Sequence, residues 1–393
     1  MNSKKTVYLD YAASAPARGS SLAAEAAYAT SGYAGANPNS LHTQGRLAAS
    51  ALDQARSDLA RCVGGKFRPS EITFTSGGTE SNNLALFGLA AGARERDRAR
   101  TKVVMSAIEH DSVLDVAAPL RAEGFAVELV RPGRDGKVAP QALADAVDGS
   151  CALVSVMYAN NETGVVQPVP ELAAVAHAAG ALFHTDAVQA FGRIPLQLAN
   201  VDAVSAAAHK IGGPVGVGLL AARGRAALRP RQFGGGQELG RRPGTQDVRG
   251  ALAFAAAAKE CLDGLEERRE ACAAKARRLY ARLCSDGGPI LATAGTAVGE
   301  DRLPGMVSLL VPELDSETMI LALDDAGFEV SAGSACSSGS LDPSHVLSAM
   351  GIARREALGS LRVSFDERAE DEDLERFADA LLGIVAARTG ARR

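Results

Sequence analysis

Two residues far apart in the chain have the chemistry of an active site. Lys210 follows His209 and precedes a glycine-rich turn, whereas Cys336 lies in the small-residue run Gly-Ser-Ala-Cys-Ser-Ser. A lysine among apolar and glycine residues is desolvated, which lowers its pKa from about 10.4 and makes a Schiff base accessible. As a thiolate, Cys336 could act as a nucleophile. Together they suggest a lysine-bound cofactor that serves a cysteine nucleophile.

A glycine-containing run at 76–83 follows a predicted strand and begins a predicted helix. Gly78 lets the backbone approach a ligand, and the free N–H groups and dipole of a helix N-terminus favour an anion. The hydroxyl of Thr79 adds a further donor. The run predicts a phosphate cradle, and the alternative is an ordinary capped helix start with Thr79 as the N-cap. It is no P-loop, because the G-K-[ST] ending is absent.

More polar side chains follow other predicted strands, namely His110, Asn161, Asp186 and Gln189. Taken singly, such a histidine is often structural and such an aspartate often caps a helix. Together, they fit a pyridine ring: Asp186 could hold a pyridinium nitrogen protonated, Gln189 and Asn161 could bond a phenolic oxygen, and His110 could stack on the ring. Phosphate cradle, carboxylate and lysine together specify pyridoxal phosphate.

The elements that must position these residues alternate along the chain. Short apolar runs lie at 71–76, 102–108, 152–158, 181–186, 201–208 and 215–222, with Ala-rich helical segments between them. This alternation predicts an α/β fold with a mostly parallel central sheet and helices on both faces. The polar residues then gather at the carboxyl edge of the sheet, where such folds bind ligands.

The alternation ends near residue 251, where a segment rich in Ala, Arg and Glu extends to 284. It is too long for one typical helix without caps, so we expect one long helix or two consecutive ones. We predict a large cofactor-binding domain at 17–255 and a smaller α+β domain at 256–393. The N-terminal segment 1–16 is expected to join the smaller domain.

Composition limits the class of protein. The chain has 393 residues, 47% of them hydrophobic, with a formal net charge of −4. It offers no general attraction to nucleic acid or anionic membranes, and it has neither a signal peptide nor an apolar run of membrane-spanning length. Six cysteines are scattered singly, so no zinc site or other metal site is predicted. We expect a cytoplasmic enzyme that binds neither nucleic acid nor membranes.

Motifs along nearly the whole chain resemble one enzyme family. They include TSGGTESNN, EHDSV, NNETG, TDAVQ, HKIGGP and SAGSACSSG, together with YLDYAASAP, RRPGTQDV and DPSHVLSAMG. By these motifs the chain is identified as a member of the cysteine desulfurases of the NifS/IscS type, within class V of the fold-type I pyridoxal-phosphate transferases. The resemblance implies conversion of L-cysteine to L-alanine, with sulfur captured as a persulfide on Cys336. An acceptor in iron–sulfur cluster assembly or tRNA thiolation would then receive that sulfur.

The resemblance also implies roles for individual residues. Lys210 would bind the cofactor covalently, His110 would stack on its ring and exchange protons, and Cys336 would carry the sulfur. Contacts to pyridoxal 5′-phosphate would come from Gly78, Thr79, His110, Asn161, Asp186, Gln189, His209, Lys210 and Thr245.

Further roles concern the substrate and a second subunit. Asn37 and Arg362 match residues that hold the substrate carboxylate. Thr245 matches a threonine that reaches the phosphate of the other subunit, which implies a homodimer with shared active sites. The partners implied are L-cysteine, a second copy of the chain and a sulfur-acceptor protein, such as an iron–sulfur scaffold or a thiolation enzyme.

Two departures from the family pattern stand out. Many members have a phosphate-bonding serine where this chain has Ala207, and residues 10–15 read DYAASA where D-N-A-A-T-T is usual. Loss of one donor to a charged group costs about 1.5–3 kcal/mol, so Ala207 puts in doubt only the tightness of cofactor binding.

Three other functions use parts of the same machinery. A class V aminotransferase or a selenocysteine lyase would need the same cofactor residues, and the run around Cys336 separates a desulfurase from them. A silent, partner-binding subunit would not need the lysine, the carboxylate and the thiol together.

Overall fold

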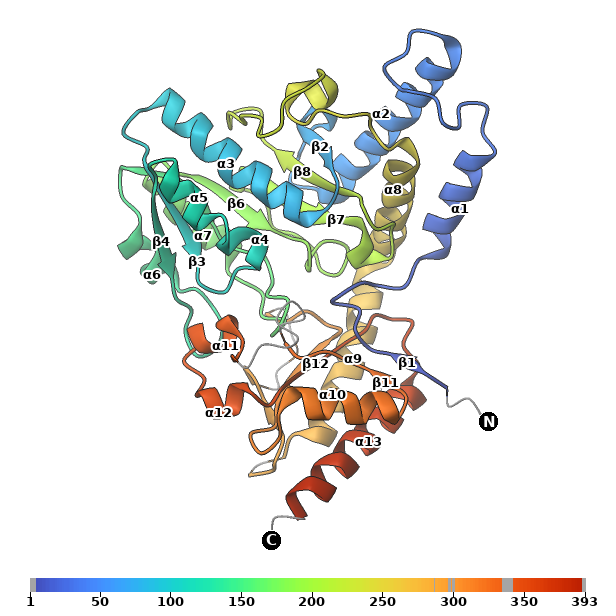
Figure 1. Cartoon of the computed structure of the whole chain (residues 1–393), viewed down its shortest axis with the longest axis vertical. Helices are drawn as coiled ribbons and strands as arrows, with labels where there is room; N and C mark the ends of the chain where they lie inside the picture. Colours follow the sequence, from blue (N-terminus) through green and yellow to red (C-terminus); the bar gives the residue numbers. More distant parts are fainter. Residues whose placement is uncertain (1–4, 286, 296–297, 299–300, 334–341, 391–393) are drawn as a thin grey trace.

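The computed structural model describes residues 5–285, 287–295, 298, 301–333 and 342–390. Its larger part is built on a seven-stranded sheet with the order β2-β8-β7-β6-β5-β3-β4 (Figure 1). The strands are β2 (Ile72–Thr75), β3 (Lys102–Ser106), β4 (Ala126–Val130), β5 (Cys151–Ser155), β6 (Leu182–Asp186), β7 (Ala203–Ala207) and β8 (Gly218–Ala222).

The sheet is mostly parallel, which confirms the predicted fold class. Strands β4, β3, β5, β6 and β7 pair in parallel, whereas β8 is antiparallel to both β7 and β2. All the apolar runs predicted as strands form strands. The sequence did not predict β4, an edge strand whose Ala126, Glu128 and Leu129 are exposed. Because β4 pairs with a neighbour on one side only and much of its surface is exposed to solvent, it lacks the continuous apolar run that predicts a buried strand.

Successive residues of the buried strands face opposite cores, as the two-residue period of a strand requires. Val103 and Met105 pack in the core beneath α3, whereas Val104 packs in the core beneath α2, α7 and α8. The helices of this part are α1 (Gly19–Ala29), α2 (Thr43–Val63), α3 (Gly78–Arg96), α4 (Asp111–Leu114), α5 (Ala117–Ala122), α6 (Pro140–Ala146), α7 (Val169–Ala178) and α8 (Val248–Leu262), with short 3-10 turns η1 (Pro69–Glu71), η2 (Ala208–Ile211) and η3 (Gln237–Gly240).

The Ala/Arg/Glu-rich segment forms two consecutive helices, α8 and α9 (Leu265–Leu283). They are separated at Gly264, whose left-handed φ of 66° is one that glycine adopts without strain. The predicted domain boundary at 255 falls inside α8, which packs on α1 and α2 of the larger part. The division of the chain into domains stays a prediction, and the break at Gly264 is the better place to test it.

The smaller part, in the lower half of Figure 1, has a hydrophobic core of its own. Its antiparallel sheet has the order β12-β10-β9, and β1 of the N-terminal segment pairs in parallel with β11. Val7 and Leu9 are buried in this core. The elements are β1 (Val7–Tyr8), β9 (Leu291–Ala292), β10 (Met306–Leu310), β11 (Phe328–Glu329), β12 (Ser360–Ser364), α10 (Ser316–Asp325), α11 (His345–Ala349), α12 (Arg354–Ala357) and α13 (Asp371–Gly390).

A small apolar cluster joins the two parts beside the carboxyl edge of the large sheet. Ile108 and Met157, which follow β3 and β5, pack against Val346 and Leu347 of α11. This contact brings the start of α11 next to the strand ends. Within the described residues, no helix combines the length and apolar character needed to cross a membrane.

Candidate active site

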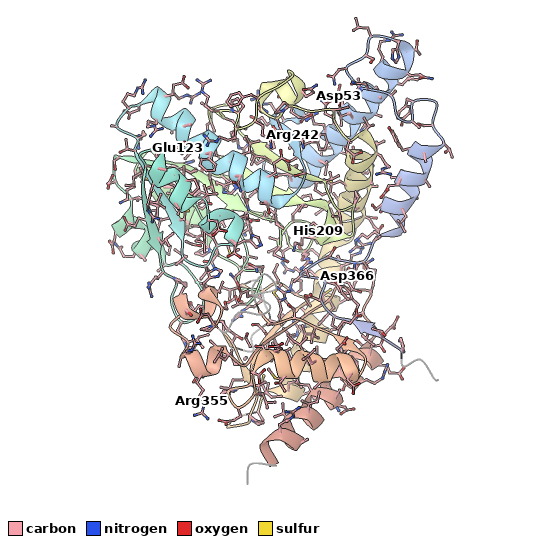
Figure 2. The ribbon with its side chains drawn as sticks, viewed as in Figure 1. Asp53, Glu123, His209, Arg242, Arg355 and Asp366 are labelled. Carbon is pink, nitrogen blue, oxygen red and sulfur yellow. The ribbon has the colours of Figure 1, made fainter. Side chains whose placement is uncertain are left out.

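A cavity of about 310 Å³ opens at the carboxyl edge of the large sheet. Nine of the residues predicted to bind cofactor or substrate line it: Gly78, Thr79, His110, Asn161, Asp186, Gln189, His209, Lys210 and Arg362. They come from the turns after β2, β3, β5, β6 and β7, and from β12 of the smaller part. Figure 2 shows His209 at the centre of the molecule, with Asp366 of the smaller part below it. The fold therefore brings distant sequence motifs to one place.

Lys210 belongs to η2, directly after β7. Its Nζ donates hydrogen bonds to the carbonyl oxygens of Ala12 (2.7 Å) and Ala13 (3.0 Å) in the N-terminal segment. Burial, together with the cations Arg193 and Arg362, lowers the pKa of Lys210 to about 8. An amine with such a pKa is partly neutral near physiological pH, which is what a nucleophilic lysine needs.

Asp186, at the end of β6, is buried and accepts a hydrogen bond at each carboxylate oxygen. Its Oδ2 accepts from Nδ2 of Asn82 (2.6 Å), and its Oδ1 accepts from the backbone N–H of Val188 (2.8 Å). Asn82 lies on the second turn of α3 and also donates to Ser112 Oγ (2.9 Å). The carboxylate is thus held in one orientation at the floor of the cavity.

His110 caps the short helix α4. Its Nδ1 accepts a hydrogen bond from the backbone N–H of Ser112 (3.0 Å) and lies 2.9 Å from the Ser112 hydroxyl. Because Nδ1 is an acceptor, a neutral His110 ring carries its proton on Nε2. The ring is therefore fixed in orientation and in tautomer.

The N-terminus of α3 forms one wall of the cavity. Its N-cap, Gly77, supplies no side chain to the first N–H groups of the helix. A Cβ at Gly78 would lie 2.8 Å from Cγ2 of Val188, so a side chain there would crowd the wall. This 19-residue helix presents free N–H groups and the positive end of its dipole to the cavity, with Thr79 exposed beside them.

His209 completes the same side of the cavity. Burial and the neighbouring charge of Lys210 lower the pKa of His209 to about 4, so its ring is neutral at physiological pH. Ala207, where many family members have serine, is buried at the end of β7 and lines the cavity without a donor.

Arg362 reaches the cavity from β12 and is almost fully buried, with 2% of its surface exposed. Its guanidinium donates to Asp10 Oδ1 (2.7 Å) and to the carbonyl oxygens of Asn161 (2.9 Å) and Gly333 (3.2 Å). Its Nε has no hydrogen-bond partner in the described part of the chain. A buried donor without a partner is costly, so Nε is a donor that the described chain leaves unsatisfied.

Two predicted residues lie outside the cavity. Asn37 and Thr245 are exposed, and Thr245 lines a separate hollow beside residues 231–237. They are nevertheless close to one another, because Nδ2 of Asn39 donates both to Asn37 Oδ1 (3.1 Å) and to Oε1 of Gln246 (3.0 Å). We call this patch, made of Asn37, Asn39, Thr245 and Gln246, the rim cluster.

Cys336 lies outside the described residues, so the structure gives no account of it. The described residues that flank its segment are Gly333 and Asp342. A Cβ on Gly333 would lie 2.8 Å from Oε2 of Glu162, a buried residue of the cavity wall. Ser344 Oγ donates to the same oxygen (2.5 Å). Both flanks of the segment therefore contact the cavity wall.

The described cysteines differ from what a nucleophile requires. Burial raises the pKa of Cys62, Cys151, Cys261 and Cys284 to about 11 and that of Cys272 to about 12. They are protonated at physiological pH and poor nucleophiles.

Sequence reasoning missed several residues of the site. Asn82, Glu109 and Asp10 lay within motifs but were given no role, and Arg193 and the carbonyl oxygens of the alanines after Asp10 were not considered. Glu109 is fully buried behind His110, where burial raises its pKa to about 8, and its Oε1 accepts from the Met157 N–H (2.7 Å). Asn82 could have been found, because it lies one helical turn after Gly78 on the same motif.

The cavity fits pyridoxal phosphate on several independent observations. The uncapped, glycine-started helix suits a phosphate, the buried Asp186 suits a protonated ring nitrogen, and the lysine of low pKa suits a carbonyl carbon. Asn82 Oδ1 is buried and has no hydrogen-bond partner among the described residues. Such a polar atom is expected where a ligand completes the hydrogen bonding.

Comparison with known proteins agrees with this reading. The aminotransferase class-V family model matches residues 7–377. The chain is 40% identical over 390 residues to an IscS-like cysteine desulfurase of Mycobacterium tuberculosis, a match covering 96% of each chain. The solved structure of a NifS-like protein superimposes with a TM-score of 0.88 at 32% identity, covering 97% of this chain and 99% of that one. A structure described as SspA in complex with cysteine matches with a TM-score of 0.77 at 31% identity, covering 92% and 99% of the two chains.

The chain therefore belongs to the class-V aminotransferase family, the class of pyridoxal-phosphate enzymes that its fold and cavity define. Within that family it is a cysteine desulfurase of the NifS/IscS type, as the sequence motifs predicted.

Proposed function

We propose that this cysteine desulfurase transfers the sulfur of L-cysteine to Cys336 through the cavity built around Lys210, and releases L-alanine. When bound, pyridoxal phosphate supplies an electron sink for the electrons left when the substrate Cα–H bond breaks. The observation that carries the proposal is the convergence of Lys210, Asp186, His110 and Arg362 on one cavity. The chain's own residues bind and orient the substrate and transfer the protons.

The substrate carboxylate is assigned to Arg362. Its Nε is free of partners in the described chain, and Asp10 and two carbonyl oxygens hold the rest of the guanidinium in place. A guanidinium fixed in this way suits a planar carboxylate. Asp186, held by Asn82 and the Val188 N–H, keeps the ring nitrogen protonated.

Protons are moved by Lys210 and His110. The amine of Lys210, with its pKa lowered to about 8, takes the proton from the substrate Cα and returns one later in the cycle. His110 offers its Nε2, because Nδ1 is engaged by the Ser112 N–H. Both groups line the cavity, which supports these two roles.

The sulfur step uses Cys336 as the nucleophile. Its thiolate attacks the sulfur of the substrate, an S–S bond forms, and the substrate C–S bond breaks with its electron pair left on Cβ. A proton taken up at Cβ completes the methyl group of alanine. The product on the protein is a persulfide, which a second thiol on an acceptor attacks in turn.

The test is incubation of the purified enzyme with L-cysteine and a thiol reductant, measuring alanine and sulfide. We expect equal amounts of both products, and loss of both in Cys336→Ala and Cys336→Ser. Absence of sulfide, or activity that survives both substitutions, would point to an aminotransferase or a selenocysteine lyase instead. A Cys62→Ala variant serves as the control, because Cys62 is a partly buried thiol of raised pKa outside the cavity.

We further propose a homodimer in which the rim cluster of one chain completes the cavity of the other. Support comes from the exposure of Asn37 and Thr245 and from their absence from the lining of their own chain's cavity. Large apolar side chains are exposed near them in the chain, with Leu41 89%, Phe233 88% and Leu239 72% exposed. A second copy would cover such side chains.

The acceptor is proposed to be an iron–sulfur scaffold protein or a thiolation enzyme, and the enzyme is proposed to act in the cytoplasm. The family resemblance supports both assignments. Incubation of persulfide-loaded enzyme with candidate acceptors, followed by mass measurement of each protein, distinguishes the two classes of acceptor.

A further inference from the structure

Arg193 lies behind the cavity and connects three of its parts. It follows β6 by seven residues, in the turn that also carries Gln189. Its Nη1 donates to Oε1 of Gln189 (3.2 Å), and its Nη2 donates to the carbonyl oxygens of Tyr11 (3.0 Å) and Lys210 (2.9 Å). One side chain thus ties the N-terminal segment, the turn after β6 and the lysine after β7.

These contacts belong to a closed set of hydrogen bonds. Gln189 Nε2 donates to the carbonyl oxygen of Ala12 (2.9 Å), which also accepts from Lys210 Nζ (2.7 Å). Arg193 closes the set by holding Gln189 from its other end and Lys210 by its backbone. Loss of Arg193 would leave Gln189, Lys210 and the N-terminal segment without their common donor.

The charge of Arg193 has no direct counter-ion. Within the described residues, no ion pair joins it to a carboxylate, although the charge of Asp366 acts on it, and its three hydrogen bonds all go to neutral oxygens. Burial lowers the pKa of Arg193, yet a guanidinium starts so high that it stays charged. A cation beside another cation disfavours the protonated form of its neighbour.

Arg193 does not touch the space where cofactor and substrate bind. It is absent from the lining of the main cavity, whereas Lys210 lines both that cavity and a second one of about 40 Å³ that Arg193 also lines. Arg193 therefore stands on the other side of Lys210 from the reacting atoms, where it can act only through its neighbours.

We propose that Arg193 is a positioning residue for Lys210: it fixes the lysine and Gln189 against the N-terminal segment and keeps a positive charge behind the cofactor-binding nitrogen. The proposal rests on the proposed role of Lys210. The charged and titratable groups around the lysine amine are Arg193, Arg362, His209, Asp186 and Asp10. The two carboxylates raise the pKa of Lys210, whereas Arg193 and Arg362 lower it. Removal of Arg193 therefore shifts Lys210 toward its protonated form.

The experiment is a pH titration of the absorbance of the lysine-bound cofactor in the holoenzyme, with Arg193→Met, Arg193→Gln and Arg193→Lys. We expect Arg193→Met and Arg193→Gln to raise the midpoint of this titration by about one pH unit or more, because a like charge has been removed. Arg193→Lys keeps the charge but not the three hydrogen bonds. This variant should leave the midpoint near that of the unaltered enzyme and let the cofactor dissociate faster.

Arg100→Met is the matched control. Nη1 of Arg100 also donates to two carbonyl oxygens, of Cys151 (3.0 Å) and Ala179 (2.8 Å), but at the opposite edge of the sheet. The titration midpoint of this variant should equal that of the unaltered enzyme. The Gln variant keeps donors for the carbonyl oxygens and covers the case in which the Met variant does not fold.

Three outcomes are decisive. Unshifted midpoints in both neutral variants overturn the electrostatic role of Arg193, and unchanged cofactor retention in Arg193→Lys overturns its positioning role. If the unaltered holoenzyme and Lys210→Ala gave the same spectrum, the assignment of Lys210 itself would fail, which is a separate result from either failure at Arg193.

Discussion

The cavity and the rim cluster differ in how completely one chain builds them. In the cavity, Asp186, Gln189 and Arg362 are buried, and each is held by hydrogen bonds of 2.6–3.2 Å to groups of the same chain. In the rim cluster, Asn37 and Thr245 are exposed and line no part of that cavity. One chain therefore builds the cavity from its own buried residues, whereas the rim cluster is an exposed surface that lines no part of that cavity.

The rim cluster is not loosely attached, despite its exposure. The nearby Glu238 and Leu239 have left-handed φ values of 49° and 58°, and the Glu238 side chain is 0% exposed. Its oxygens accept from Nη1 (2.7 Å) and Nη2 (2.8 Å) of Arg56 and from the N–H of Phe74 (2.8 Å) on edge strand β2. This strained backbone, the largely buried ion pair and the hydrogen bond from Gln246 Nε2 to Glu238 (3.3 Å) hold the loop that bears Thr245 in place.

The largest effect is expected at the cavity. Lys210→Ala removes both the cofactor-binding nitrogen and the base, so alanine formation should fall by at least about 10³-fold. Lys259→Ala is the control, because that side chain is 63% exposed. Cofactor absorbance and alanine release report the two losses separately, and activity of Lys210→Ala near that of the control would contradict the account of the cavity.

The second largest effect is expected at Glu238, which anchors the loop of the rim cluster. Glu238→Gln leaves the mostly buried Arg56 with only the exposed Asp53 as a counter-charge, at 3.9 Å, and should cost up to about 3–5 kcal/mol in unfolding free energy. Denaturant unfolding measures this loss. Glu270→Gln breaks the exposed pair with Arg277, where about 0–1 kcal/mol is expected. Equal effects of the two substitutions would mean that Glu238 anchors nothing.

The hydroxyl of Thr245 should have a smaller effect, and one that appears in the other chain. Thr245→Ala removes one hydrogen bond to a charged group, about 1.5–3 kcal/mol, or about 10- to 150-fold in cofactor affinity. Mixed dimers of Thr245→Ala and Lys210→Ala chains regain one intact site if the rim cluster acts across the interface. Mixing under limiting cofactor should therefore restore activity. No gain on mixing would place Thr245 outside the partner's site.

The pH dependence sharpens the description of the cavity. Only the neutral amine of Lys210 reacts with the cofactor, and below its pKa the neutral fraction falls about tenfold per pH unit. The rate at which cofactor-free enzyme binds pyridoxal phosphate should rise with pH and level off near the lowered pKa of about 8. A rate that still rises to about pH 10 would show an ordinary, solvated lysine.

Sequence reasoning located the cavity because its residues sit at strand ends. Strands β2, β3 and β5 to β8 are buried apolar runs, and Asp186, Lys210 and His110 directly follow or end them. The local pattern therefore gives both the strand and the edge on which the side chain lies. The edge strand β4 was not predicted, because its exposed Glu128 breaks the apolar run.

The remainder of the site depends on approaches between distant segments, which no local pattern encodes. The carbonyl oxygens of Ala12 and Ala13 reach Lys210 across some two hundred residues. Arg193 contacts Tyr11 in the same way. Asn37 and Thr245 were found only through the family resemblance, because exposed polar residues in turns carry no physical signal of their own.

Sulfur transfer to Cys336 is the central claim, and mass spectrometry of the Cys336 peptide after brief exposure to L-cysteine tests it most directly. The account predicts one added sulfur on Cys336, removed by a thiol reductant, and none on the buried thiols of raised pKa. Alanine release with an unmodified Cys336, or sulfur found on one of those other cysteines, would contradict it.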